Sequence, residues 1–383
     1  MRLADLAPPD RFRTQDEVHD ALRAACEANP DLAQFDVVGR SEEGRPIAGV
    51  TLGYGPRTVT LVAGAHADEP VGPETLRTLV LEGLAARDWG APDGGLEALF
   101  ERFTLRVVPH VNPDGEARNQ AWIGAWDADR PAQTLGHFLR ERRREPPGRD
   151  VEFGYPVMRP ENAAASRFLF PYAPVALHAS LHGMASSEGA LLLVEEDWID
   201  HPAARGLRVG FEAAAADAGL RLHDHDRGAE KGFRYGGPGF WTTPEGRAMR
   251  AHFEAAGDAE TAAQFFLSSM ETAVLTGRAR GGPAASGARA GRAGGRPATP
   301  LCLVTELPLF VLDAAYDREP GRPALLESFR ERTPALAEAA ARADDLAPLL
   351  DGLGLRCLDL ATAVRLHLRV LGLGLAAVGG AGE

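Results

Sequence analysis

Cysteine is scarce in this sequence of 383 residues, and the few that occur do not suggest cross-links. Cys26, Cys302 and Cys357 are scattered and odd in number, and two of them sit in apolar runs. A secreted disulfide scaffold carries an even and dense set of cysteines. We therefore expect buried free thiols.

Export and membrane signals are also lacking. The N-terminus has no basic segment followed by a long apolar core, which is the pattern of a secretory signal. We see no apolar stretch of the length that a membrane span needs. The sequence therefore predicts a soluble, cytoplasmic protein.

Lysine is almost absent, and the formal net charge is −13. Such a charge argues against nucleic acid and anionic membranes as partners, because both repel an acidic protein. Residues 278–300 are nearly all Gly, Ala, Arg, Pro and Ser, with five arginines. A nucleic-acid role for these arginines is an alternative, but the lack of apolar residues favours a flexible inserted loop.

What the sequence does contain is an alternation of apolar strands with helical periodicity. Strands are predicted at 35–38, 47–52, 58–63, 103–109, 175–183, 190–194 and 301–310. Helices are predicted at 14–29, 73–86, 134–148, 161–169, 203–218, 334–350 and 357–371, with a turn at 111–115 and a fraying C-terminal tail. This order predicts an α/β fold, a three-layer α/β/α sandwich with a central mixed, mostly parallel twisted sheet.

The domain organisation follows from length and spacing. A chain of this length forms one large α/β domain or two small ones. We find neither an internal repeat nor an obvious domain boundary. A single domain over 1–383 is therefore predicted, with its core at about 14–312 and C-terminal helices at about 320–375.

Polar side chains follow three of the predicted strands. His66 and Glu69 leave the strand at 58–63, and Pro70 keeps Glu69 out of helical geometry. A hydrogen-bonded loop pair is the alternative for these two. His182 and Glu306 lie near the ends of two later strands, and in open α/β sheets the chemistry gathers at the carboxyl ends of strands.

Two histidines and one glutamate would make a catalytic zinc site. Three protein ligands leave the fourth zinc position open for water, and zinc lowers the pKa of that water to about 7. Hydrolysis also needs a base that returns the proton to the leaving amine, and Glu306 is placed for this role. A pair with a buried arginine is the alternative for Glu306.

Other histidines have plainer interpretations. His178 lies four residues before His182, so both point to the same side of one strand, and we assign His178 to structure. His182 itself could be a satisfied core histidine. His223 and His225 lie in a polar stretch, which favours an exposed segment over a second metal site.

Four motifs in order give this chain a specific resemblance. They are His66-x-x-Glu69 after Ala63-Gly64-Ala65, Asn112-Pro113-Asp114-Gly115, Ser180-Leu181-His182-Gly183 and Thr305-Glu306-Leu307-Pro308, preceded by the segment Gly39–Pro46. Over roughly residues 14–312 the sequence resembles the zinc carboxypeptidase family, the carboxypeptidase A-like peptidases. The resemblance implies one zinc ion on His66, Glu69 and His182, with Glu306 as general base and acid.

The same resemblance implies residues on the substrate side. Arg118 would polarise the scissile carbonyl, and Asn112 would contact the substrate. Arg130, in Asp127-Ala128-Asp129-Arg130, would grip the substrate carboxylate; a surface salt bridge is its alternative, and Arg159 is the competing candidate. Asp129 replaces the family's Asn, and the family's mobile Tyr has no match.

These observations predict a zinc-dependent hydrolase of an amide or peptide bond, of the metallocarboxypeptidase type, that acts on a peptide or an acyl amino acid. Two alternatives stay open. One is a deacylase or amidase of N-acyl amino acids or modified peptides on the same fold. The other is a binding protein that keeps the fold and has lost turnover.

Overall fold

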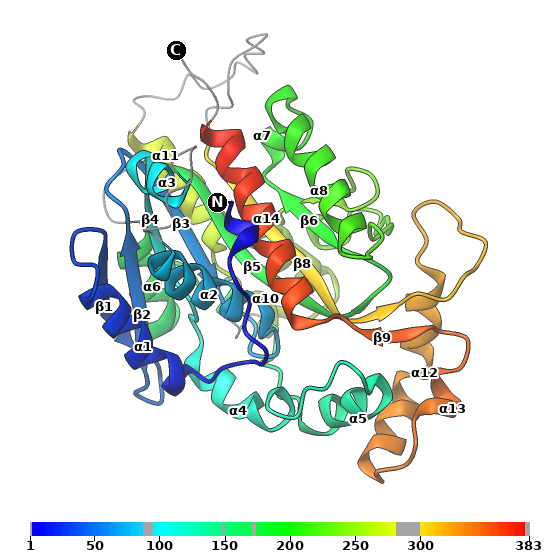
Figure 1. Ribbon diagram of the computed structural model, residues 1–383. Coiled ribbons are helices and arrows are strands. Elements are labelled where there is room, and N and C mark those ends of the chain that lie inside the picture. The colour runs from blue at the N-terminus through cyan, green and yellow to red at the C-terminus, as the bar shows by residue number, and fades with distance from the viewer. Residues whose placement is uncertain are drawn as a thin grey trace.

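The computed structural model describes residues 2–86, 95–147, 149, 151–170, 174–280 and 299–379. Within them a single nine-stranded sheet has the order β1-β2-β4-β3-β5-β8-β6-β7, and β9 pairs with β8. The strands are β1 Ala33–Arg40, β2 Pro46–Leu52, β3 Arg57–Ala63, β4 Phe103–Val108, β5 Val175–Ser187, β6 Leu191–Val194, β7 Phe240–Thr242, β8 Leu301–Leu312 and β9 Leu355–Cys357. All seven predicted strands are present (Figure 1).

The sheet is mixed. Its centre, β4-β3-β5-β8, is parallel throughout, whereas β1 and β2 pair antiparallel on one side and β6 runs antiparallel to β8 on the other. Helices cover both faces, so the predicted three-layer α/β/α architecture is confirmed.

The helices are α1 Gln15–Glu27, α2 Val71–Ala85, α3 Gly95–Arg102, α4 Pro113–Ile123, α5 Pro131–Glu141, α6 Pro160–Leu169, α7 Glu196–Ile199, α8 Arg205–Asp217, α9 Gly246–Ala255, α10 Ala259–Ala262, α11 Ser269–Arg280, α12 Ala324–Ala341, α13 Ala347–Leu350 and α14 Leu360–Gly379. Short 3-10 helices lie at η1 Leu3–Asp5, η2 Pro202–Ala204 and η3 Glu230–Gly232.

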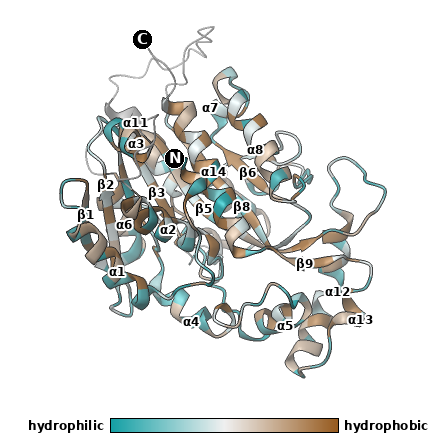
Figure 2. Cartoon of the chain, in the orientation of Figure 1, coloured by the Kyte–Doolittle hydropathy of each residue, from teal (hydrophilic) through white to brown (hydrophobic). Residues whose placement is uncertain are grey.

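The alternation of side chains along the central strands divides the core into two apolar layers. Leu177, Ala179 and Leu181 of β5 pack in the layer that also contains α1, α2, α8 and α14. The intervening residues of β5 face the layer that contains α6 and α11. Figure 2 shows the hydrophobic residues concentrated along the strands and on α14. His178 and His182 therefore lie on the α6 and α11 side of the sheet.

The last helix, α14, corrects the expectation that no stretch is long and apolar enough to span a membrane. Its 20 residues pass that test by length and composition, with a mean hydropathy of 1.4. However, 56% of the helix window is buried inside the protein, where α14 contacts α2, α8, β5 and β8. Figure 1 shows it lying across the middle of the sheet. Its hydrophobicity is that of a core helix.

Some predicted boundaries are wrong for local reasons. The turn expected at 111–115 is the start of α4, because Asn112 caps the helix by accepting from the amide of Gly115 and Pro113 occupies its first position. The helix expected at 134–148 ends at Glu141. The helix expected from Pro334 instead begins at Ala324 and contains Pro334 in its interior.

Three further predictions are wrong or concern residues outside those that the structure describes. Leu355–Cys357 form β9, where a helix from Cys357 was expected, and α14 begins only at Leu360. The predicted flexible loop at 278–300 lies mostly outside the described residues, since 281–298 are not described, and residues 278–280 belong to α11. The tail that was expected to fray, beyond Gly379, also lies outside them.

Candidate metal centre

The loop between β3 and α2 carries His66 and Glu69. Gly64 opens it with φ of +76°, and a Cβ there would lie 2.5 Å from Nδ1 of His110, so this turn requires glycine. Glu69 stands just before α2, for which Pro70 is the N-cap residue. As predicted, Pro70 keeps Glu69 outside the helix.

His182 and Glu306 come from neighbouring strands. They are direct partners in the parallel pairing of β5 with β8, so their side chains leave the same face of the sheet next to each other. Gly183 follows His182, and its amide donates to Oε2 of Glu69 at 3.1 Å. This hydrogen bond links the end of β5 to the loop before α2.

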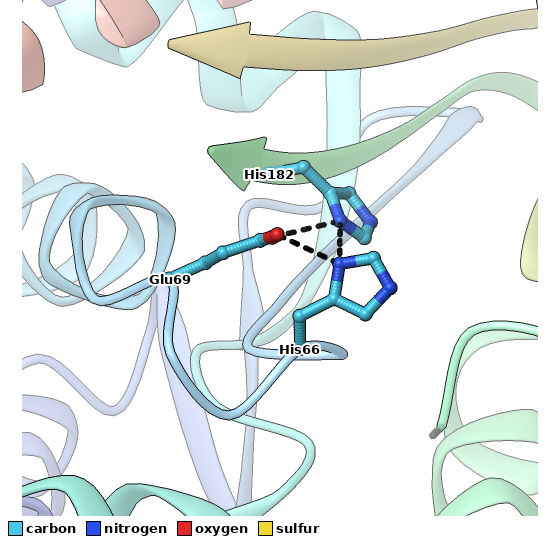
Figure 3. A group of neighbouring side chains, drawn as sticks. All are labelled: His66, Glu69 and His182. Carbon is cyan, nitrogen blue, oxygen red and sulfur yellow. Dashed lines mark hydrogen bonds and ion pairs between the residues drawn. The ribbon is translucent and has the colours of Figure 1, made fainter. Parts of the chain in front are cut away.

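The side chains of His66, Glu69 and His182 converge on one point. Nδ1 of His66 lies 2.8 Å from Oε1 of Glu69, and Nδ1 of His182 lies 3.0 Å from Oε2 of the same carboxylate. The two Nδ1 atoms lie 3.2 Å apart. Figure 3 shows the three groups pointing toward one another, His66 and Glu69 from the loop before α2 and His182 from β5. The predicted ligand set is therefore brought together in space.

This donor set fits a zinc ion. Donors at about 2.0–2.1 Å from a tetrahedral zinc lie about 3.3 Å apart, which is close to the separations seen here. The chemistry agrees, because two imidazole nitrogens and a carboxylate that face one another need a cation or a shared proton between them. The side chain of His182 is 2% exposed and that of His66 is 33% exposed, so the centre opens to solvent on the His66 side.

Charges shift the pKa values around this centre. Burial, followed by the negative charge of Glu69, raises the pKa of Glu306 to about 8. Burial would lower the pKa of His182, but the Glu152 carboxylate outweighs it and the pKa is raised. Burial would raise the pKa of Glu69, but the two histidines outweigh it and the pKa is lowered. Five titratable groups thus share one site, a pattern typical of functional sites.

Glu152 is a site residue that the sequence interpretation missed. Its Oε2 lies 2.8 Å from Nε2 of His182, on the opposite side of the ring from Glu69. Glu152 is 6% exposed. It follows β4 by more than forty residues in an irregular segment, so neither periodicity nor a strand end marks it. The hint that the sequence gives of its burial is that Glu152 is an acidic residue between the apolar Val151 and Phe153.

Arg142 is the second missed residue. A run of arginines such as that at 140–144 usually marks a solvated face, but Arg142 does not lie on one. Its guanidinium ion-pairs with Asp68, within the His66–Glu69 loop, and lies 4.6 Å from the centre of the Phe138 ring. Arg143 and Arg144 are exposed as expected.

Asn112 and Arg159 meet at a carboxylate of the chain itself. Nδ2 of Asn112 donates to Oε2 of Glu145 at 2.9 Å, and Nη1 of Arg159 donates to Oε1 at 2.8 Å. Arg159 is almost fully buried and also pairs with Glu161 at 3.0 Å. A substrate carboxylate could reach these two residues only by displacing Glu145.

The other two predicted substrate residues are more exposed. Arg118, on α4, ion-pairs with Glu43 and lies 3.9 Å from Glu145; its side chain is 44% exposed. Arg130 precedes α5 and pairs with Asp127 at 3.5 Å with 68% of its side chain exposed. This pair is the surface salt bridge that was the alternative interpretation of Arg130. The substrate roles of Arg118 and Arg130 stay predictions.

Two other histidines, His178 and His223, have buried partners. His178 lies between Thr60, at 2.8 Å, and Ser269, at 2.9 Å, and burial lowers its pKa to about 4. These contacts agree with its assignment to structure. The expectation of an exposed 223–225 stretch is wrong for His223, which is 2% exposed and 3.0 Å from Oγ of Ser187, because its strand-like segment pairs with residue 190.

Comparison with known proteins supports the resemblance inferred from the motifs. Residues 18–152 match the model of the zinc carboxypeptidase family. This segment contains His66 and Glu69, whereas His182 and Glu306 lie beyond it. The fold brings His182 to His66 and Glu69, and Glu306 is the strand partner of His182.

The relatives match over a limited length. Zinc carboxypeptidase A 1 of Anopheles gambiae is 35% identical over 108 residues, which are 28% of this chain and 24% of that protein. The inactive metallocarboxypeptidase ECM14 of Ajellomyces capsulatus is 28% identical over 116 residues, 28% of this chain and 18% of that one. The match to these curated relatives thus spans a quarter of their length or less.

Solved structures give broader coverage at low identity. A metallo-carboxypeptidase from Burkholderia cenocepacia is 17% identical with a TM-score of 0.47, covering 95% of this chain and 69% of that one. Carboxypeptidase A from Helicoverpa armigera is 14% identical with a TM-score of 0.40. The match covers 88% of this chain and 75% of that one. The match over residues 18–152, which include two of the three donors, confirms the resemblance to the zinc carboxypeptidase family that the motifs predicted.

Proposed function

We propose that this protein is a zinc-dependent hydrolase that cleaves an amide or peptide bond. The observation that carries the proposal is the convergence of His66, Glu69 and His182, whose donor atoms all lie within 4.8 Å of one another. A bound zinc ion would supply a nucleophile at neutral pH and polarise a carbonyl. Three protein ligands leave a coordination position of the zinc open for the water and the carbonyl.

Glu306 is the proposed general base and acid. Its backbone is paired with that of His182, so its carboxylate stands beside the donor cluster without being part of it. In the metal-free site, burial and Glu69 raise its pKa to about 8. A bound cation would lower this pKa, toward the range in which a carboxylate accepts and gives up a proton near neutral pH. It would take the proton of the attacking water and deliver it to the leaving amine.

Arg118 is the proposed group for the developing oxyanion, because a guanidinium stays charged at every relevant pH. The substrate would be a peptide or an acyl amino acid, with Arg130 as the exposed candidate for its carboxylate. A second candidate function is supported by the contacts of Glu145. Since Asn112 and Arg159 are already engaged by this carboxylate, an amidase for modified peptides that lack a free terminal carboxylate fits the same site.

The test is the variant Glu306→Gln. It keeps the size of the side chain and removes the base, so zinc should stay bound while turnover falls by at least 10²–10⁴-fold, the usual contribution of a general base. Zinc content is measured by elemental analysis, and activity is assayed side by side on dipeptides, N-acyl amino acids and C-terminally amidated peptides. A variant that retains most of its activity would refute the mechanism. A wild-type protein that binds zinc but turns over no substrate in this panel would support a binding protein instead.

A further inference from the structure

His182 has two ring nitrogens, and the structure gives each a different environment. Nδ1 faces the donor cluster, at 3.0 Å from Glu69 and 3.2 Å from His66. Nε2 faces away from it, at 2.8 Å from Oε2 of Glu152 and 2.8 Å from Oγ of Ser180. The ring is therefore held from both sides.

The partner at Nε2 decides where the ring proton sits. A carboxylate can only accept, whereas the hydroxyl of Ser180 can donate or accept. With the Glu152 oxygen 2.8 Å away, a bare Nε2 would direct its lone pair at a negative charge. Nδ1 faces the carboxylate of Glu69 in the same way, so the two nitrogens become distinct when a cation lies among the donors. Nδ1 then gives its lone pair to the cation, and the proton stays on Nε2, where Glu152 accepts it.

Glu152 is itself firmly held. The carbonyl of Val151 accepts from Nδ2 of Asn162 at 2.7 Å, and the carbonyl of Phe153 accepts from the amide of Phe266 at 2.8 Å. Both hydrogen bonds come from other segments, one of them from α6. A buried carboxylate is costly unless it is paired, and the ring of His182 is a partner that the structure gives Glu152.

We propose that Glu152 is a positioning residue, which fixes His182 in the tautomer with the proton on Nε2 and presents Nδ1 to the metal. The inference rests on the proposed function, because it assumes a metal on His182. It assigns to the site an acidic group outside the three ligands and the general base. Outer partners of this kind typically govern metal affinity by 10–100-fold.

The test measures zinc affinity by competition with a chromophoric chelator, together with the unfolding of the metal-free protein. In Glu152→Gln the amide can turn its NH₂ toward Nε2 and favour the opposite tautomer, so zinc affinity should fall 10–100-fold. Glu152→Asp keeps the charge and should retain more of the affinity. Glu116→Gln is the matched control, since Glu116 is also a buried carboxylate, paired with Arg77 at 2.8 Å, and should leave zinc affinity unchanged.

A spectroscopic readout keeps the proposal testable if a variant does not fold. In the zinc-loaded wild type, ¹⁵N NMR should show the His182 ring bound through Nδ1 with its proton on Nε2. A proton on Nδ1 would overturn the inference, and so would a Glu152→Gln protein that binds zinc within twofold of the wild type. The proposed function fails separately: in that case the wild type itself binds no zinc, or Glu306→Gln remains active.

Discussion

At the scale of single residues, His223 links a buried ring to the pH dependence of stability. Burial, followed by the charge of His225, lowers its pKa to about 3 from an ordinary 6.5. As the pH falls, the unfolded chain binds this proton first, so the stabilisation is complete above pH 6.5 and is lost toward pH 3. Each unit of difference in pKa corresponds to about 1.4 kcal/mol.

The variant His223→Asn removes the titration and keeps a donor for Ser187. We expect the stability of the wild type to fall relative to this variant between pH 6.5 and 4, by about 1.4 kcal/mol per pH unit. Urea unfolding measures this difference in the free energy of unfolding. EDTA is present, so that loss of metal does not affect the stability of either protein. Parallel stability curves for the two proteins would contradict the prediction.

Residues of the site were predictable to different degrees. His66 and Glu69 could be found because they leave a clearly apolar strand and precede a proline. Glu152 and Arg142 could not, because their roles depend on contacts across the fold, with His182 and Asp68. A run of arginines looks the same in sequence whether one member is buried against Phe138 or all are solvated.

At the scale of elements, the contact between α2 and β5 is what brings Glu69 to His182. Gly72, in the first turn of α2, allows it: an added Cβ would lie 2.4 Å from the carbonyl oxygen of Leu181. Leu181 is the residue before His182. The strand that carries His182 and the helix that follows Glu69 therefore touch through backbone alone at this point.

Gly72→Ala should separate these elements. We expect a loss of stability of about 1–3 kcal/mol, as is usual for overpacking, together with weaker zinc binding. Gly83→Ala in the same helix is the control, because its Cβ would meet nothing closer than Leu96 at 3.9 Å; it should be neutral or stabilising by up to about 1 kcal/mol. Equal unfolding midpoints for the two variants would show that the close approach does not matter.

Strands were more predictable than helix ends. Buried strands are short, continuous apolar runs, so β3, β5 and β8 stand out in the sequence. Helix boundaries depend on caps and on tertiary contacts, as at Asn112, where proline and glycine belong to a helix start. The three residues of β9 carry no local signal, because only their pairing with β8 makes them a strand.

At the scale of the whole molecule, the metal centre ties together distant parts of the chain. Its ligands come from the loop after β3 and from β5, more than a hundred residues apart. A ligand that binds the folded state alone stabilises it by RT ln(1 + [L]/Kd), or about 2.7 kcal/mol at one hundred times Kd. We therefore expect zinc to raise the unfolding midpoint of the whole protein.

His66→Ala isolates this effect. Because His66 is partly exposed, its loss should cost the metal-free protein little, while the gain in stability on adding zinc should largely disappear. Thermal unfolding of both proteins with EDTA and with zinc gives the comparison. An equal zinc-induced shift in the variant would place the binding site elsewhere.

The position of α14 has a consequence for the order of events during synthesis. This helix packs on β5, β8 and α2, and Nδ1 of its His367 lies 3.0 Å from Oγ1 of Thr75. The strands and the helix around the metal centre thus remain partly uncovered until residues 360–379 have left the ribosome, long after His66 and His182. A nascent polypeptide halted before α14 should therefore bind zinc more weakly than one that includes this helix.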